Sequence, residues 1–468
     1  MLTSQATPVT MPRSSRRWPA FSVYNRLVIL ALLCVATGSR AAAAQGIPTI
    51  DPEDAINPIA IVEGAGVKVG EGTVLHPSVG VEGGFTSNVF YTDQNAQASA
   101  LLRILGEVGT GSLPPQRMGG TEQEESTLGA PAVEDYGDFQ YHADLRASYD
   151  FYPSTVSDVS EQGGLGLGAL FRGIINPHKP LQVAIFENYQ RLIRPENFES
   201  PGNVNRDINT FKLQGMYAPY GRSLSGILRY QMTLDLFEAD RQQFADRFQN
   251  TFGFRLNWQW LPQTRLYFDI SEGVYTGIGS SSQKVSSYPL VALVGIQTLL
   301  TPNVTLVGRL GYTNGFYSTG PSYSAVVGGA QLGYRFTPVS RITLLYNYLH
   351  NDSINANYYR DHDTRLTLEH EFRPFDLFIT AGLIFREYTG LVSTMPPVVY
   401  TGMGVRDDTL GLVNAELTYN FRDWLAAAVT YQLMVDSTDY TYVTMVGGPV
   451  INPGYVQHTV FLGVRAAY

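Results

Sequence analysis

The side chains that could do chemistry in this chain are sparsely placed. The best enzyme-like cluster is Arg360-Asp361-His362-Asp363, in which a histidine lies between two carboxylates. A histidine oriented by a carboxylate can act as a general base, so a hydrolytic site is one interpretation of this segment. A general base also needs a positioned partner, which a single segment does not supply. The favoured interpretation is a solvated loop edge, and we predict no catalytic residue.

Cofactor patterns are equally weak. The run Gly164-Leu165-Gly166-Leu167-Gly168 resembles a phosphate-binding loop, but no helix is predicted after it, and glycine within a strand often marks a close approach of the backbone. The seven histidines and the single Cys34 lack the spacing of a metal site. We therefore predict no metal and no cofactor. The formal net charge of −9 also argues against a nucleic-acid partner.

The charged residues form a more informative group. Many of them alternate with apolar residues, which places them together on one face of predicted strands. This set is Arg146, Arg229, Arg247, Arg255, Arg265, Arg309, Arg365, Asp144, Asp235, Asp269, Glu369, Glu371 and Glu416.

Period-two alternation is the strongest pattern in the chain. Within 140–151 and 247–260, polar residues alternate with apolar or aromatic ones along the whole segment. The pattern indicates strands with one polar and one apolar face. Their length suits a tilted crossing of a bilayer, which takes about 9–11 residues, and exceeds the strand of about 5–6 residues usual in soluble sheets. A large soluble antiparallel protein is the alternative interpretation.

The connections between these segments alternate between short and long. Short ones such as 261–263 contrast with longer ones such as 438–455, as expected of tight turns at one end of a barrel and loops at the other. The sequence thus predicts an all-β fold, a transmembrane antiparallel up-and-down β-barrel of about 18 strands, with 16 as an alternative. The predicted strands are 78–91, 98–107, 138–152, 164–173, 181–193, 207–219, 223–236, 247–260, 264–277, 287–300, 303–317, 324–337, 341–352, 359–372, 375–389, 409–421, 424–437 and 456–468.

The beginning of the chain predicts export. Residues 1–44 combine several arginines with an apolar run and a small-residue cleavage site, which is typical of a signal peptide. We predict that 45–77 form a periplasmic lead-in segment and that 78–468 form the outer-membrane barrel. Residues 108–137 contain an acidic, proline-bearing stretch and are predicted to be a disordered insertion.

The last strand ends in an aromatic residue, as in many outer-membrane barrels. Alternation predicts that Leu462, Val464 and Ala466 face lipid and that, together with Tyr468, they form a signal for the barrel-assembly machinery. Aromatic residues also cluster beside the predicted short turns, as in an interfacial girdle. These features predict the outer membrane of a Gram-negative bacterium, with its lipid and lipopolysaccharide as partners.

A barrel of this size encloses a water-filled channel unless it is plugged, so the charged face becomes the predicted pore lining. Two interpretations of that lining stay open. The charges either pair with one another and solvate the lumen, or the arginines guide an anionic solute, because guanidinium binds carboxylate well. Asp235 and Asp269 lie in the outer halves of their strands, whereas Arg255 and Arg265 lie nearer the opposite ends. This spacing predicts a basic zone below a more acidic one.

The amino-terminal segment carries a family resemblance. Gly66-Val67-Lys68-Val69-Gly70, Leu75-His76-Pro77-Ser78-Val79 and Gly83-Gly84-Phe85-Thr86-Ser87-Asn88-Val89-Phe90 resemble the opening of the β-barrel porin 2 family, although Ser87 stands where aspartate is common. That family is similar to outer-membrane proteins that accompany exopolysaccharide synthesis and export. The resemblance implies a channel for exopolysaccharide export, with periplasmic polysaccharide-export components as partners. The alternatives are a general diffusion porin for small solutes and an outer-membrane enzyme with a site at its rim.

Overall fold

The computed structural model describes most of the chain from residue 66 onward. The described residues are 66–70, 73–111, 138–177, 179–193, 205–219, 223–279, 282, 284–354, 356–391, 399–400, 406–443 and 450–468. The predicted signal peptide, the predicted lead-in as far as residue 65 and the predicted insertion from residue 112 onward lie outside them.

Eighteen long strands of the described chain form one closed antiparallel barrel. They contain 11 to 17 residues each, long enough to cross a bilayer at a tilt. These strands are β2 (Thr73–Thr86), β3 (Ser99–Gly111), β4 (Phe139–Phe151), β5 (Gly164–Ile175), β6 (Leu181–Leu192), β7 (Arg206–Tyr217), β8 (Leu224–Phe237), β9 (Arg247–Leu261), β10 (Thr264–Gly277), β11 (Leu290–Thr301), β12 (Val304–Asn314), β13 (Ser324–Thr337), β14 (Ser340–Asp352), β15 (Tyr358–Phe372), β16 (Phe375–Thr389), β18 (Arg406–Arg422), β19 (Leu425–Thr438) and β22 (Tyr455–Ala467).

Other elements lie outside the barrel ladder. The short strand β1 (Val67–Gly70) pairs with the start of β2. The strands β17 (Val399–Tyr400), β20 (Tyr442–Val443) and β21 (Val450–Ile451) form a separate small sheet. The helices α3 (Ser157–Ser160) and η3 (Asp240–Ala245) lie in two of the longer connections. None of the described helices is long and apolar enough to span a membrane.

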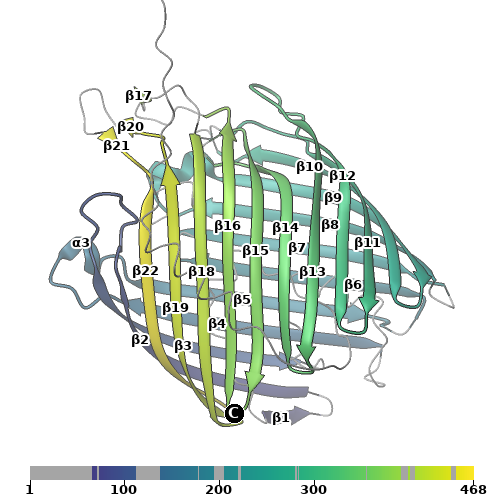
Figure 1. Ribbon diagram of the computed structural model, residues 1–468, viewed down its shortest axis with the longest axis horizontal. Coiled ribbons are helices and arrows are strands. Elements are labelled where there is room, and N and C mark those ends of the chain that lie inside the picture. Colours follow the sequence, from purple (N-terminus) through teal and green to yellow (C-terminus); the bar gives the residue numbers. More distant parts are fainter. Residues whose placement is uncertain are drawn as a thin grey trace, which may run out of the picture. The chain divides into compact units, whose positions relative to one another are not determined.

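The barrel closes between its first and last strands. β2 pairs with β22 in a register that sets Val79 opposite Ala466, and Tyr468 donates its backbone N–H to the carbonyl oxygen of Pro77 at 2.9 Å. Elsewhere each barrel strand pairs with its neighbours in sequence, and Figure 1 shows β14–β19 in front of β4–β8. The predicted antiparallel barrel of 18 strands is confirmed, and the weakest predicted strand, 98–107, corresponds to β3.

Several strand boundaries differ from the prediction. β2 ends at Thr86 and β12 at Asn314, where the prediction continued to 91 and 317. β2 begins at Thr73 and β3 continues to Gly111, so that residues 74–77 pair with 108–111. The predicted barrel began directly after Pro77, and proline cannot donate to a ladder. Since Pro77 lies opposite the very end of β22, its missing N–H interrupts that ladder only where the ladder stops. Residues 73–77 therefore belong to the barrel, and 108–111 belong to a strand.

The two ends of the barrel differ in their connections. Two residues join β9 to β10, β11 to β12 and β15 to β16, whereas nine or more residues join β2 to β3, β8 to β9 and β12 to β13. We name these the short-turn end and the long-loop end. The connection from β3 to β4 is the long exception on the short-turn side. Long loops at one end give the chain room to fold over the mouth of the barrel.

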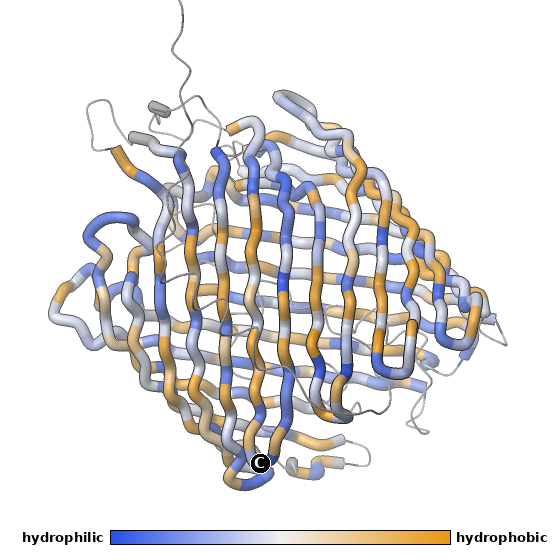
Figure 2. Tube along the Cα trace, viewed as in Figure 1, coloured by the Kyte–Doolittle hydropathy of each residue, from blue (hydrophilic) through white to orange (hydrophobic). Residues whose placement is uncertain are grey.

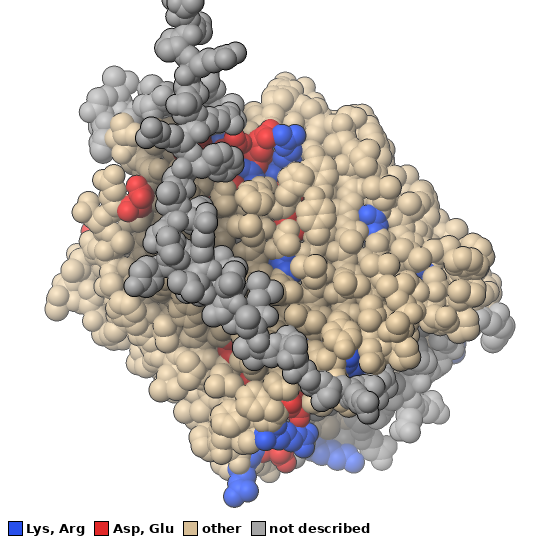
Figure 3. Space-filling view, viewed as in Figure 1, with Lys and Arg blue, Asp and Glu red and all other residues tan. Residues whose placement is uncertain are grey.

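The strands have an apolar outer face and a polar inner face. On β22, Val460, Leu462 and Val464 are exposed, whereas Thr459 and Arg465 are buried on the other face. Figure 2 shows the same alternation of hydropathy along neighbouring strands, and Figure 3 shows acidic and basic side chains gathering toward two ends of the visible face. A closed barrel leaves no free strand edge, so an apolar outer face of this kind can contact hydrocarbon.

Aromatic side chains on the outer face lie near the short-turn end. Trp258 and Trp260 of β9 are both about half exposed, with ring centroids 6.4 Å apart. Phe375 packs edge-on against Tyr419 with ring centroids 4.9 Å apart. Aromatic rings prefer the boundary between hydrocarbon and water, so this band marks the expected level of one membrane surface.

The predicted insertion residues share the outer face of β22. Leu462 is 62% exposed and Val464 is 50% exposed, and Ala466 follows them in the same alternation. The terminal Tyr468 is exposed just beyond the strand. Their recognition by the assembly machinery stays a prediction, because the fold shows where these residues lie and not what binds them.

Candidate functional site

The inner wall holds the charged residues that the sequence groups together. Asp269 of β10 lies directly opposite Arg255 of β9 and accepts a hydrogen bond from its Nε at 2.6 Å. Arg229 of β8 donates to the second oxygen of the same carboxylate. Two guanidinium groups from different strands therefore share one acid, and this group of three residues keeps one positive charge.

Most of the other predicted pore-lining charges are paired as well. Each lies on the inner face of its strand and reaches a neighbour of opposite charge. The pairs are Arg146 with Asp144 (2.7 Å), Arg247 with Asp235 (2.9 Å), Arg365 with Asp363 (2.9 Å), Arg341 with Glu369 (2.7 Å) and Arg373 with Glu371 (2.8 Å). The interpretation in which lumen charges pair with one another therefore describes most of this set.

Three of the predicted residues have other partners. Arg309 of β12 donates to the amide oxygen of Asn347 at 2.9 Å, and Arg265 of β10 donates to Gln259 at 3.3 Å. Neither arginine forms an ion pair with a residue that the structure describes. Glu416 accepts from the Thr418 hydroxyl at 3.0 Å. Arg265 and Arg309 are consequently the members of the set most able to attract an anion.

The predicted separation of a basic zone from an acidic zone is wrong. Asp269 bonds Arg255 directly, although the prediction placed them in different zones. Asp235 likewise lies between Arg206 and Arg247, at 3.4 Å and 2.9 Å. The register of antiparallel pairing decides which residues of two adjacent strands lie at the same height in the barrel. The position of a residue along its own segment does not reveal this height.

The enzyme-like cluster at 360–363 is divided between two faces. Asp361 and Asp363 are buried on the inner face of β15, whereas Arg360 and His362 lie on the outer face. The His362 ring stacks on Tyr348 with centroids 4.6 Å apart. Because successive side chains of a strand point in opposite directions, the histidine cannot use its neighbouring carboxylates. In the described part of the chain, no group of three acidic, histidine or cysteine side chains could hold a metal.

One glycine explains how large side chains lie flat against the inner wall. A Cβ atom on Gly295 of β11 would come within 2.1 Å of the Tyr267 ring. Without that atom, the ring lies over the backbone, and the Arg255 guanidinium lies 4.8 Å from its centroid. Glycine at this position therefore keeps an arginine and an aromatic ring close to the wall and leaves more of the lumen open.

The long-loop end is narrowed by segments that fold inward. Ile354, in the connection between β14 and β15, packs against Phe237, Phe244 and Ala245 around η3. η3 belongs to the connection between β8 and β9, five strands away round the wall. Neighbouring strands lie about 4.8 Å apart, so five steps span roughly 24 Å of wall. Direct packing over that span requires the loops to reach across the mouth.

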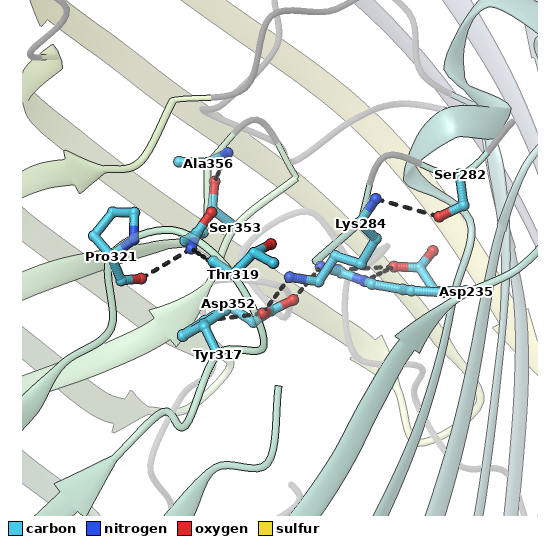
Figure 4. Close-up of polar contacts among 11 residues, drawn as sticks. Asp235, Ser282, Lys284, Tyr317, Thr319, Pro321, Asp352, Ser353 and Ala356 are labelled. Carbon is cyan, nitrogen blue, oxygen red and sulfur yellow. Dashed lines mark hydrogen bonds and ion pairs between the residues drawn. The ribbon is translucent and has the colours of Figure 1, made fainter. Parts of the chain in front are cut away.

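A polar group at this mouth joins the same segments (Figure 4). We name it the mouth cluster, and it consists of Asp235, Arg247, Lys284, Tyr317 and Asp352. Lys284 donates to Oδ1 of Asp352 at 2.5 Å, and the Tyr317 hydroxyl donates to the same oxygen at 3.1 Å. Arg247 lies 2.9 Å from Asp235 and 3.6 Å from Oδ2 of Asp352. Three segments other than that of Asp352 therefore converge on its carboxylate.

The environment fixes the protonation of Tyr317. Burial raises the pKa of the Tyr317 phenol well above its ordinary value, and the nearby Asp352 carboxylate raises it further. The phenol consequently stays protonated and acts as a donor at every physiological pH. Lys284 is also buried, with its ammonium 5.5 Å from the centre of the Tyr317 ring.

Asn357 fixes the two loops beside the cluster. Its side-chain amide donates to the carbonyl oxygens of Thr319 and Pro321 at 3.0 Å and 2.9 Å, and Figure 4 shows these two residues beside Ser353. Gly320 between them has a φ of +77°, a conformation that a Cβ atom disfavours. These bonds hold the connection between β12 and β13 against the one between β14 and β15.

A second loop folds inward from the connection between β2 and β3. Tyr91 packs against inner-face residues of β16, β18 and β19, among them Ile384, Leu410 and Met434. Its ring meets Tyr455 edge-on at 5.1 Å. The mouth is thus covered from two sides, by Tyr91 over one part of the wall and by the mouth cluster over another.

Sequence reasoning missed Lys284, Tyr317, Asp352 and Tyr91. The predicted strands 78–91 and 303–317 wrongly included Tyr91 and Tyr317, which lie in connections after the ends of β2 and β12. Lys284 lies in a connection and Asp352 at the end of β14, where alternation is a poor guide to the face. A weak signal was present for one of them, because Lys284 is a lysine in a chain whose other basic residues are mostly arginine.

Comparisons with known proteins give no family for this chain. No protein-family model matches it, so the resemblance of residues 66–90 to the β-barrel porin 2 family gains no support. No curated protein matches it either.

Solved structures share the general architecture. Pseudomonas aeruginosa OpdK with vanillate matches with a TM-score of 0.44 at 8% identity, over 84% of this chain and 99% of that one. Acinetobacter baumannii OccAB4 matches with a TM-score of 0.41 at 10% identity, over 84% and 98%. The siderophore receptor PirA from Pseudomonas aeruginosa matches at 0.39 and 9% identity, over 84% and 80%. At these TM-scores the likeness carries no functional argument, and function rests on the geometry of this chain.

Proposed function

We propose that this protein is a channel of the bacterial outer membrane that passes small hydrophilic solutes without covalent chemistry. The observation that carries the proposal is a closed 18-strand barrel with an apolar exposed outer face and a charged inner face. Closed barrels satisfy their own backbone groups in lipid, and barrels of about 16–18 strands enclose an aqueous channel. Outer-membrane lipid, lipopolysaccharide and the barrel-assembly machinery are the partners that this placement requires.

The inward loops favour small solutes over polymers. Tyr91 and the mouth cluster both occupy the long-loop end, so a wide chain could pass only after two loops had moved. A diffusion channel with a narrowed mouth is therefore the function that the geometry supports best.

Export of an exopolysaccharide is the second candidate. It draws on the sequence resemblance of residues 66–90 and on one observation in the lumen. Arg265 and Tyr267 lie on β10 and Arg309 lies on β12, with β11 between them in one wall. Neither arginine has a described acidic partner. Guanidinium groups beside an aromatic ring suit an acidic sugar polymer. In that case periplasmic polysaccharide-export components would be further partners.

Conductance separates a channel from a closed barrel. Purified protein in planar bilayers should give discrete conductance steps, and liposomes that contain it should swell in isotonic arabinose or glucose. Deleting residues 87–92, which include Tyr91, should enlarge both signals because it removes one cover of the mouth. Folded protein that neither conducts nor admits sugars, with or without that deletion, would contradict the proposed function.

Release of polymer in cells separates the two candidates. If small sugars permeate the liposomes and a deletion strain still secretes its exopolysaccharide, the diffusion channel is supported and export is excluded. Loss of secretion in that strain, restored by the wild-type gene and not by a variant in which Arg265 and Arg309 are serine, would favour export.

A further inference from the structure

Three donors from separate segments surround the carboxylate of Asp352. They are Lys284 Nζ, the Tyr317 hydroxyl and, at a longer distance, Arg247 Nη1. Lys284 comes from the connection between β10 and β11, Tyr317 from the connection between β12 and β13, and Arg247 from the start of β9. A lysine, a phenol and a guanidinium that converge in this way form a general receptor for a carboxylate.

The Asp352 carboxylate accepts these short hydrogen bonds through only one of its two oxygens. Its Oδ1 takes both short hydrogen bonds, whereas its Oδ2 is buried and accepts none. Arg247 lies 3.6 Å from that oxygen, beyond the length of a charge-assisted hydrogen bond of about 2.7–2.9 Å. The Asp352 side chain is only 8% exposed, so the bare oxygen lies in a place where an unmade bond is costly.

Asp352 contributes one of the two carboxylates in the described ion pairs of this site. In the described ion pairs, three cations, Arg206, Arg247 and Lys284, meet two carboxylates, those of Asp235 and Asp352. Asp352 is the last residue of β14 and precedes the inward connection, so it is the acid best placed to leave with that loop.

We propose that the mouth cluster is a binding site for the carboxylate of a small solute, and that Asp352 occupies this site until a solute displaces it. The proposal rests on the proposed channel function and adds the substrate class and its selection. A solute with a carboxylate and a ring of hydroxyls, such as a uronic acid, would bond Lys284, Tyr317 and Arg247 together. Displacement of Asp352 would free the connection between β14 and β15 to leave the mouth.

Calorimetry on the purified barrel in detergent tests the binding step. D-glucuronate is titrated against wild type, Asp352→Ala and Asp352→Asn, and D-glucose serves as the neutral probe of the same ring shape. When the Asp352 carboxylate occupies the site most of the time, only the small fraction of molecules with a free site can bind solute, and the apparent affinity falls in proportion. Removing Asp352 should therefore tighten glucuronate binding by about tenfold. Asp352→Asn, which keeps the shape and loses the charge, should also bind more tightly than wild type.

Two further variants make the result specific. Adding Lys284→Met to Asp352→Ala should abolish the gain, because the principal donor is lost. Asp361→Asn removes the same charge from a buried carboxylate of β15 that bonds Arg386 of β16 and is not part of the mouth cluster, and it should leave glucuronate affinity unchanged. Heat-modifiable migration on a gel confirms that each variant is folded, and Asp352→Asn decides the matter if Asp352→Ala does not fold.

Conductance measured on the same samples distinguishes the two proposals. If the variants bind glucuronate more tightly but no protein conducts, the carboxylate site stands and the channel function is wrong. If all proteins conduct but neither Asp352 variant gains affinity, or glucose binds as well as glucuronate, the carboxylate site is wrong and the channel stands. Tighter binding to the control Asp361→Asn would also overturn the site, because it would trace the effect to net charge alone.

Discussion

Placing an arginine on the outer face of β22 should destabilise the protein by an amount that depends on its depth in the membrane. Leu462 is the eighth of thirteen residues in this strand and is 62% exposed on the outer face. Near the midplane of a bilayer, a lipid-facing arginine costs about 2–4 kcal/mol. We therefore expect Leu462→Arg to lower the free energy of unfolding by that amount.

Val456 provides the matched position on the same face of the same strand, and it is 50% exposed. Six residues separate it from Leu462, which corresponds to about 20 Å along the strand. A strand tilt of about 40° reduces this to roughly 15 Å across the membrane. The apolar band of such barrels is about 25 Å tall, so Val456 lies near its edge, where the arginine should cost only about 0–1 kcal/mol.

Reversible denaturant unfolding in lipid vesicles measures both costs. Trp258, Trp260 and Trp424 lie beside short turns and report unfolding by their fluorescence. The wild-type barrel and the two arginine variants are compared in the same vesicles. Equal costs at Leu462 and Val456, or a larger cost at Val456, would refute the placement of this face against hydrocarbon.

Three shorter predictions test other parts of the reasoning. Asp269→Asn removes the negative charge that Arg229 and Arg255 share, so reversal potentials in a salt gradient should shift toward anion preference. An unchanged potential would show that this group lies outside the ion path. The long connections of such barrels face the cell exterior and the short turns face the periplasm, so a peptide tag at Gly447 should be reached by antibody on intact cells and a tag at Pro302 should not. The reverse pattern would show the opposite orientation. Deleting Tyr468 removes the aromatic end and its backbone bond to β2, so less folded protein should reach the outer membrane, as measured by heat-modifiable migration of membrane fractions.

The sequence determined the architecture because its periodicity is local. Alternation along segments such as 247–260 requires no knowledge of neighbours, and it predicted a barrel whose strand count is confirmed. The assignment of faces followed from the same rule, and Leu462 and Val464 are exposed on the outer face as expected. Two-residue turns could also be predicted from the sequence, since they interrupt the alternation at a definite place.

Alternation nevertheless misjudged what each inner position contacts. It predicts that an arginine is tolerated better at Gly463, on the inner face, than at Leu462. A Cβ atom on Gly463 would lie 2.8 Å from the Cγ of Glu82, so this inner position has no room either. The register of β2 against β22 creates that contact between residues far apart in the chain.

Pairing of charges was decided only by the tertiary structure. Whether Asp269 lies above Arg255 or beside it depends on register, which sets the height of residues on adjacent strands. The mouth cluster depends on more distant relations still, because Lys284, Tyr317 and Asp352 come from three different connections or strand ends. Loop segments have no periodicity that assigns them a face. They acquire a position only when closure of the barrel brings their ends round the same mouth, and that closure is a property of the whole chain.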